Sequence, residues 1–201
     1  MPALLKLRIS LDEAITYGRR RLAKRLVTDG LRQARNGELL GEWEYFKGQA
    51  EILKGNYFEA IMHFDKAVAY NPSDGASYND RALCMVELGL INEAFAYFDK
   101  GIEVEPDYAT VYHNKGWLLN KVGRHKDAIE YFKKTLSLEP DRAVTYENLG
   151  DSLAHLEQYR ASLAAYKKAI ILLKGNASGI KRQLVSQMRR IGRKLHMRKE
   201  E

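Results

Sequence analysis

Glu147, Asp151 and His155 follow one another at intervals of four residues, a spacing that places all three on one face of a helix. Carboxylate and imidazole groups at this spacing could hold a metal ion in principle, with His113 as a further ligand from another helix. Any polar helix face produces the same spacing, however, and the HExxH motif of metalloproteases is absent. We therefore expect no metal and no cofactor.

Residues for catalysis form no recognisable pattern either. The sequence shows no nucleophile paired with a base, no glycine-rich phosphate loop and no distinct pair of catalytic carboxylates. The other histidines, His63, His125 and His196, are scattered along the chain and are interpreted as surface or partly packed residues. We expect a protein that is not an enzyme.

The elements that must position these side chains repeat every 34 residues. Five series keep this period: Pro72, Pro106 and Pro140; Gly55, Gly89 and Gly123; Ala60, Ala94 and Ala128; Phe64, Phe98, Phe132 and Tyr166; Tyr78, Tyr112 and Tyr146. The glycines permit a tight turn after a first helix, and the prolines end a second helix. A fixed period of this length predicts a solenoid of stacked helix pairs.

The pattern Tyr112, Gly116, Gly123, Ala128, Phe132 and Pro140 resembles the tetratricopeptide repeat. The resemblance covers four units, at about 41–74, 75–108, 109–142 and 143–176. It implies an all-α fold, an α-solenoid of antiparallel helix pairs that coils into a right-handed superhelix.

Two units depart from the pattern. The first holds Glu44 where an aromatic residue is expected. The last holds Ser162 at the alanine site, Glu157 at the turn glycine and Lys174 in place of the proline.

Basic helical segments are expected at both ends of one continuous domain, outside the four units in 38–176. Residues 1–37 are interpreted as a degenerate N-terminal helical repeat of uncertain register. In 177–201 one apolar stripe faces a side rich in Lys and Arg, which predicts an amphipathic capping helix. The stripe consists of Ile180, Leu184, Met188, Ile191 and Leu195. Such a helix can also meet an anionic membrane or serve as a partner helix.

The resemblance also implies a binding surface, because the concave face of this fold is lined by residues of each first helix. Carried over position by position, the candidate peptide-binding residues are Asn79, Asp80, His113, Asn114, Trp117, Asn120, Lys121, Glu147, Asn148, Asp151 and His155. In the first unit the same positions hold Tyr45, Phe46, Gln49 and Ile52.

Two features of this surface suggest how a peptide could be held. Asn114 and Asn148 occupy the same place in successive units, with Asp80 in the matching place before them, and a ladder of amides can bond a peptide backbone. The alternative is that both amides bond neighbouring helices or water. Trp117 offers a large anchor of the kind enriched in binding hot spots, unless the fold itself buries the indole.

One well-known use of this fold is disfavoured. Arrays that clamp the acidic C-terminus of chaperones carry a lysine at the fifth position of a unit. Here the fifth positions hold Tyr45, Asn79, His113 and Glu147, so the two-carboxylate clamp cannot be assembled. Lys121 is the main cation available to a free carboxylate.

Charge is segregated along the chain. Residues 1–37 carry a net charge of about +6 and 174–201 about +7, whereas 38–173 carry about −6. Basic ends could therefore meet the acidic body of a second copy, giving a self-assembling scaffold. Attachment to nucleic acid or an anionic membrane is less favoured, because 177–201 contain no aromatic residue for base stacking.

The remaining features of the sequence bear on where in the cell the protein is expected. No apolar run is long enough to span a membrane, the start lacks the pattern of a signal peptide, and the single cysteine, Cys84, fits a reducing compartment. We expect a cytoplasmic adaptor, a protein–protein interaction module that binds a peptide or helix of another protein in its groove.

Overall fold

The computed structural model describes residues 2–173 and 177–197. Within these ranges the chain forms eleven α-helices and no strand, so the expectation of an all-α fold is confirmed. None of the described helices is long and apolar enough to cross a bilayer. Lys174 and the expected end of the capping helix, 198–201, lie outside the described residues.

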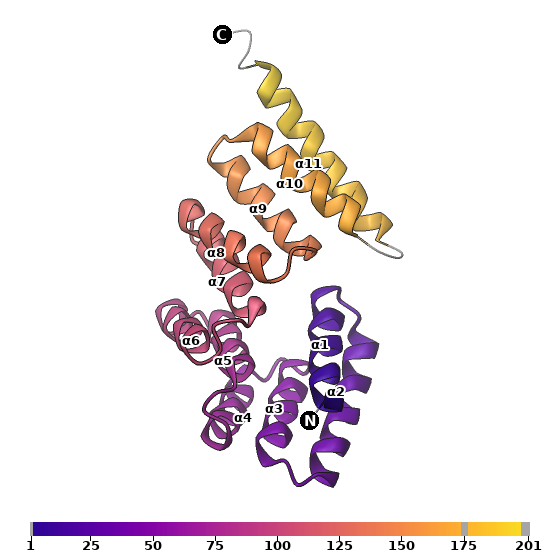
Figure 1. Ribbon diagram of the computed structural model, residues 1–201, viewed down its shortest axis with the longest axis vertical. Helices are drawn as coiled ribbons and strands as arrows, with labels where there is room; N and C mark the ends of the chain where they lie inside the picture. The colour runs from indigo at the N-terminus through magenta and orange to yellow at the C-terminus, as the bar shows by residue number, and fades with distance from the viewer. Residues whose placement is uncertain (1, 174–176, 198–201) are drawn as a thin grey trace. The chain divides into compact units, whose positions relative to one another are not determined.

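The helices belong to two compact units, Met1–Pro106 and Asp107–Glu201, and we describe each unit by itself. The first unit contains α1 (Pro2–Thr16), α2 (Arg20–Asn36), α3 (Leu40–Ile52), α4 (Tyr57–Tyr70), α5 (Gly75–Glu87) and α6 (Ile91–Val104). The second contains α7 (Ala109–Lys121), α8 (His125–Leu138), α9 (Ala143–His155), α10 (Tyr159–Leu172) and α11 (Ser178–Met197). Within each unit, each helix packs side by side with the next one along the chain (Figure 1).

A left-handed backbone residue ends the turn between the helices of each pair. Gly55, Gly89 and Gly123 have φ of +88°, +79° and +81°, a region that glycine enters without steric cost. Glu157 stands at the fourth of these places with φ of +60°. The departure noted in the sequence thus leaves the turn conformation unchanged, although a residue with a side chain now adopts it.

In the pairs α3–α4, α7–α8 and α9–α10, an aromatic ring of the second helix lies directly against a glycine of the first helix, whereas the α5–α6 pair has Ala82 at this position. A Cβ atom placed on Gly48, Gly116 or Gly150 would come within 2.7, 2.8 and 2.7 Å of the rings of Phe64, Phe132 and Tyr166 respectively. Each ring lies 16 residues after its glycine. Contact this close lets the two helix axes approach and buries the rings almost completely.

The same contact extends toward the N-terminus. Gly30 on α2 lies against the ring of Phe46 on α3, again 16 residues later. Phe46 is fully buried. Helix α2 therefore packs on α3 through the same contact between a ring and a glycine that occurs in the later pairs. The sequence alone left the helical register of residues 1–37 uncertain.

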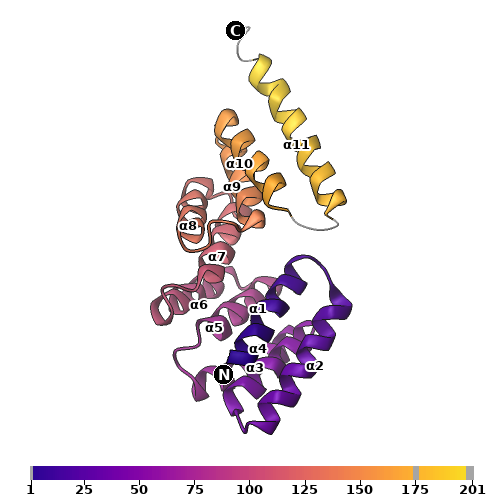
Figure 2. The ribbon, with the colours of Figure 1, turned by 45° about the vertical axis from the view of Figure 1, so that its right-hand side comes forward.

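The last described helix, α11, covers the end of the second unit. Its buried residues Leu184 and Ile191 join a cluster with Tyr159 and Tyr166, and Figure 2 shows α11 alongside α10. The opposite side of α11 remains in solvent and is basic: Arg182, Arg189, Arg190, Arg193 and Lys194 are exposed. The apolar stripe predicted for this helix therefore packs against the rest of the second unit.

We predict that Gly116→Ala lowers the free energy of unfolding by about 1–3 kcal/mol, because the added methyl must displace the buried ring of Phe132. Gly192→Ala is the matched control: Gly192 lies inside α11 with open space around its Cβ position, so alanine should preserve or raise stability. Unfolding by heat or urea, followed by circular dichroism, measures both. Equal effects of the two substitutions would contradict the role given to the ring contact.

Candidate functional site

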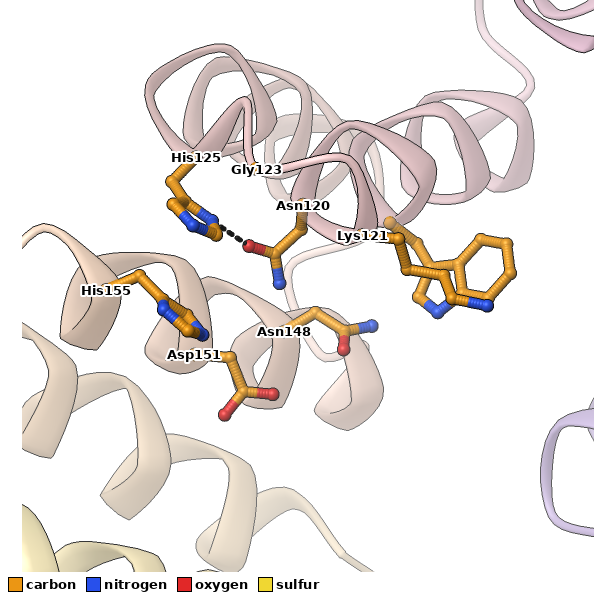
Figure 3. A pocket seen from close by; sticks show the side chains of 8 residues that line it. Asn120, Lys121, Gly123, His125, Asn148, Asp151 and His155 are labelled. Carbon is orange, nitrogen blue, oxygen red and sulfur yellow. Dashed lines mark hydrogen bonds between the residues drawn. The ribbon is translucent and has the colours of Figure 1, made fainter. Parts of the chain in front are cut away.

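A pocket of about 510 Å³ lies in the second unit, between the C-terminal half of α7, the turn into α8, and α9 (Figure 3). Most of its lining residues carry polar side chains, and one carries a large aromatic ring. The lining residues are Trp117, Asn120, Lys121, Gly123, His125, Asn148, Asp151 and His155. Among the candidates proposed from the sequence, the structure therefore brings together Trp117, Asn120, Lys121, Asn148, Asp151 and His155.

The aromatic wall is the indole of Trp117, which is partly exposed. The ammonium group of Lys121, one helical turn later, lies 4.6 Å from the centre of the ring. This contact holds the side chain of Lys121 against the indole. An incoming group therefore meets an apolar surface with a positive charge beside it.

The opposite rim is formed by two stacked imidazoles. The ring centroids of His125 and His155 are 4.3 Å apart and the ring planes differ by 6°. Nδ1 of His125 is hydrogen-bonded to Oδ1 of Asn120 at 2.5 Å, which fixes both side chains (Figure 3). Desolvation, and next the neighbouring His155, lower the pKa of His125. The stack therefore favours the uncharged form of this ring.

His125 was missed as a site residue by sequence reasoning. It belongs to the start of α8, whereas the carried-over positions all lie on first helices. A usable signal was nevertheless present, because the turn at Gly123 returns the chain beside the end of α7 and so places His125, two residues later, at the pocket.

The floor of the pocket carries a carboxylate. Asp151 accepts a hydrogen bond of 2.5 Å from the hydroxyl of Tyr166, the residue whose ring packs on Gly150. Desolvation raises the pKa of Asp151, against the smaller opposing effects of the Tyr166 bond and the charges of His155 and Arg190. Glu147, one turn earlier on α9, also has a raised pKa, through desolvation and then the charge of Asp151. Both groups accept protons more readily than ordinary carboxyls.

The described residues contain no group of three or more His, Cys, Asp or Glu side chains arranged to hold a metal ion. His113, considered as a ligand from the neighbouring helix, is directed elsewhere. Its Nδ1 is 2.9 Å from Oγ1 of Thr145, and its ring packs against Phe132.

His113 is therefore a core residue, and it does not line the pocket. Its side chain is buried, and desolvation, with a further contribution from Arg142, lowers its pKa to about 3. The imidazole is buried because its position on α7 directs it toward Phe132 on α8 and Thr145 near the start of α9. Only its Nε2, at 3.5 Å from Nδ2 of Asn148, approaches a residue of the pocket wall.

The two amides of the expected ladder differ in position. Asn148 lines the pocket, whereas Asn114 is partly buried outside it. Asn79 and Asp80, which continue the series, belong to the first unit. Asn79 is buried and its side-chain amide donates to Oδ1 of Asp80 at 2.9 Å, while Gln49 donates to the other oxygen of Asp80. These two candidates are engaged with each other and with α3.

Family models of the tetratricopeptide repeat match residues 76–108 and 107–174 of the chain. Among curated proteins, the chain is 35% identical over 54 residues to Hsp70-Hsp90 organizing protein 3 of Arabidopsis thaliana, which covers 27% of this chain and 10% of that protein. It is 37% identical over 54 residues to the Hsp70-Hsp90 organizing protein of Triticum aestivum, covering 27% of this chain and 9% of that protein. The chain thus matches about a tenth of the length of these relatives.

Solved structures resemble the chain over much more of its length. A thermophilic TPR protein of Thermus thermophilus has a TM-score of 0.70 at 18% identity and covers 94% of this chain and 98% of its own. MamA of Desulfovibrio magneticus RS-1 has a TM-score of 0.61 at 18% identity, covering 81% and 94%. YrrB, described as a TPR protein with an unusual peptide-binding site, has a TM-score of 0.58 at 18% identity, covering 86% and 88%. These likenesses show the fold.

The 34-residue period, the left-handed turn residues and the ring-on-glycine contacts agree with the two model matches. Residues 76–174 of the chain are tetratricopeptide repeats, and the described chain has the fold of tetratricopeptide repeat proteins.

Proposed function

We propose that this protein is a non-enzymatic interaction module that binds a peptide segment of another protein in the pocket between α7 and α9. The observation that carries the proposal is the convergence, in one pocket, of a partly exposed indole with amide, imidazole and carboxylate groups. Concave sites that combine an apolar anchor with a few placed polar groups are typical of ligand binding.

The chemistry of the pocket defines the peptide that would suit it. The indole of Trp117 takes an apolar or aromatic side chain. Asn120 and Asn148 offer amides, which can donate to and accept from a peptide backbone. Asp151 accepts hydrogen bonds and favours a ligand group that donates them, such as the side chain of a lysine or arginine. The preferred ligand is an extended segment with an apolar residue close to a basic one.

Binding of Hsp70 or Hsp90, the proteins that appear in the names of the matched relatives, is not part of this proposal. The side chains at the relevant positions argue against a ligand that ends in acidic residues. Glu147 and Asp151 lie on α9, His113 is buried with its pKa lowered, and Lys121 lies against the indole. The pocket itself pairs one cation, Lys121, with one carboxylate, Asp151, so its lining offers no cluster of cations to a chain of carboxylates.

A second candidate function, self-association, rests on one observation. In α10 and α11 the exposed charged side chains are all basic, and neither helix contains Asp or Glu. Helix α6, by contrast, carries Glu93, Asp99 and Glu103 with Lys100 as its single Lys or Arg. The basic end of one copy could therefore meet the acidic helix of another.

We predict that Trp117→Ala weakens binding of a selected peptide about 30-fold or more, the effect of losing a hot-spot anchor. Trp43→Ala is a matched control, because Trp43 on α3 also has a lysine, Lys47, over its ring at 5.3 Å but lies outside the pocket. Peptides would be selected from an array on the wild-type protein, and affinities measured by calorimetry. Equal losses in the two variants would place the binding site elsewhere.

We also predict that affinity for a basic peptide falls as the pH is lowered from neutrality. The pKa of Asp151 is raised, so its carboxylate is present above that pKa and is lost on acidification sooner than in an ordinary aspartate. Asp151→Asn should bind more weakly at the higher pH and show a flatter profile. A variant profile parallel to that of the wild type would show that a group other than Asp151 causes the pH dependence.

Self-association predicts a mass above that of one chain in light scattering at about 50 mM salt, and the mass of one chain at about 500 mM salt, where exposed charges are screened. Arg189→Glu combined with Arg193→Glu should abolish the larger species at about 50 mM salt. A single-chain mass throughout would exclude this candidate and leave the peptide-binding function intact.

A further inference from the structure

The face of the first unit that corresponds to a peptide groove is covered by the protein's own α1. Arg8, in the middle of α1, donates two hydrogen bonds to the carboxylate of Asp74, at 2.8 and 3.0 Å. Its Nε donates to Glu42 at 3.0 Å, and its guanidinium lies 3.7 Å from the centre of the Tyr45 ring. One side chain thus joins α1 to α3 and to the start of α5.

These contacts form a complete recognition site for a guanidinium group. The carboxylate of Asp74 accepts two hydrogen bonds from the guanidinium, and Glu42 accepts a third from Nε. The ring of Tyr45 covers one face of the planar cation. The Arg8 side chain is only 14% exposed and that of Asp74 only 6%. Asp74 is itself held by hydrogen bonds from the backbone and hydroxyl of Ser77, because it caps α5. The site is rigid and largely dry.

The residues beneath α1 coincide with positions in Met1–Pro106 that the family resemblance assigned to ligand binding. Tyr45 is one of them, and Asp80 is another. Desolvation raises the pKa of Asp80 to about 7, and the largest further contribution is the charge of Asp12, which is also on α1. Helix α1 therefore lies where a bound segment would lie.

Two observations distinguish α1 from an ordinary terminal cap. A capping helix presents a polar outer side to water, but Leu5 and Ile9, on the outer side of α1, are 59% and 56% exposed. Beneath the helix, Oε1 of Gln49 is buried and accepts no hydrogen bond from the described part of the chain. The covered face thus keeps an acceptor that α1 leaves unsatisfied, and α1 keeps apolar surface that the face does not bury.

The turn between α1 and α2 provides a pivot. It consists of three residues, Tyr17–Arg19, and Gly18 in its centre has φ of +64° with no heavy atom within 4 Å of its Cβ position. Rotation at this glycine would separate α1 from α2 and expose Leu4, Leu11 and Ala14, which are buried. The contact of Gly30 on α2 with Phe46 on α3 does not involve α1.

We propose that the α3–α5 face of the first unit is a second binding site, whose ligand is an amphipathic helix of a partner protein that presents an arginine to Asp74, Glu42 and Tyr45. Helix α1 is the built-in competitor for this site, with Arg8 in the place of the partner's arginine. Tethering gives a competitor a high effective concentration, so the wild-type protein exposes the site only in the fraction of molecules whose α1 is displaced. This site is separate from the α7–α9 pocket, and either proposal can fail alone.

The test uses the full chain and a fluorescently labelled synthetic peptide with the sequence of residues 2–16, titrated by anisotropy. Arg8→Ala removes the tethered arginine and should increase the affinity for the peptide about tenfold or more. Adding Glu42→Gln to that variant should reverse most of the gain. A control peptide with alanine at the position of Arg8 should bind at least about tenfold more weakly than the native peptide.

Circular dichroism establishes whether Arg8→Ala remains folded, since it leaves the buried Asp74 without its cation. A second measurement on the wild-type protein makes the test independent of that variant. Amide hydrogen exchange in α1 should be faster than in α2 and α3, because α1 opens on its own. Exchange of α1 only together with α3 and α5, or equal peptide affinity of wild type and a folded Arg8→Ala variant, would show that α1 is a fixed brace and would overturn the proposal.

Discussion

The contact between an aromatic ring and a small residue sixteen residues earlier, a glycine in the pairs α3–α4, α7–α8 and α9–α10, is the constraint on which the rest of the structure depends. It sets how closely the two helices of a pair approach, and so where every other side chain of the pair lies. In the α9–α10 pair the same residue also builds the site: the ring of Tyr166 packs on Gly150, and its hydroxyl donates to Asp151. The ring that packs on Gly150 thus also orients the carboxylate of Asp151 at the floor of the pocket. In the α7–α8 pair, Phe132 packs on Gly116 and against the ring of His113, which directs that histidine into the core.

One architecture therefore produces two different surfaces. In the second unit, the side chains of α7 and α9 leave a pocket with an indole on one wall and stacked imidazoles on another. In the first unit, the corresponding side chains are occupied: Asp80 by Gln49 and Asn79, and Tyr45 by Arg8. The difference follows from α1, whose arginine supplies the cation that the carboxylates of α3 and the α5 cap require. The basic residues at the two ends of the chain also differ in environment. Arg8 on α1 is buried in ion pairs, whereas the basic side of α11 faces solvent.

The period of 34 residues was sufficient to predict the all-α fold, the helix pairs and the turn residues, because each depends on local chemistry that recurs along the chain. The family resemblance, carried over position by position, supplied most of the residues of the pocket wall, and those spaced three or four apart on α7 and α9 share a helix face. Burial could not be predicted so well. His113 and Asn79 occupy positions that point toward neighbouring helices, and only the packed structure shows that these neighbours enclose them. The contact of Arg8 with Asp74 spans 66 residues and follows no period, so no spacing in the sequence indicated it.

The most direct test of the account is amide hydrogen exchange of the full chain with and without a peptide selected for binding. We predict protection of the pocket segments, at about 114–125 and 147–155, because bound peptide would restrain the ends of α7 and α9 and the turn between α7 and α8. The first unit should be unchanged, since α1 already occupies the matching face. Protection confined to α3 and α5, or to the basic side of α11, with no change around Trp117 and Asp151, would contradict the assignment of the binding site.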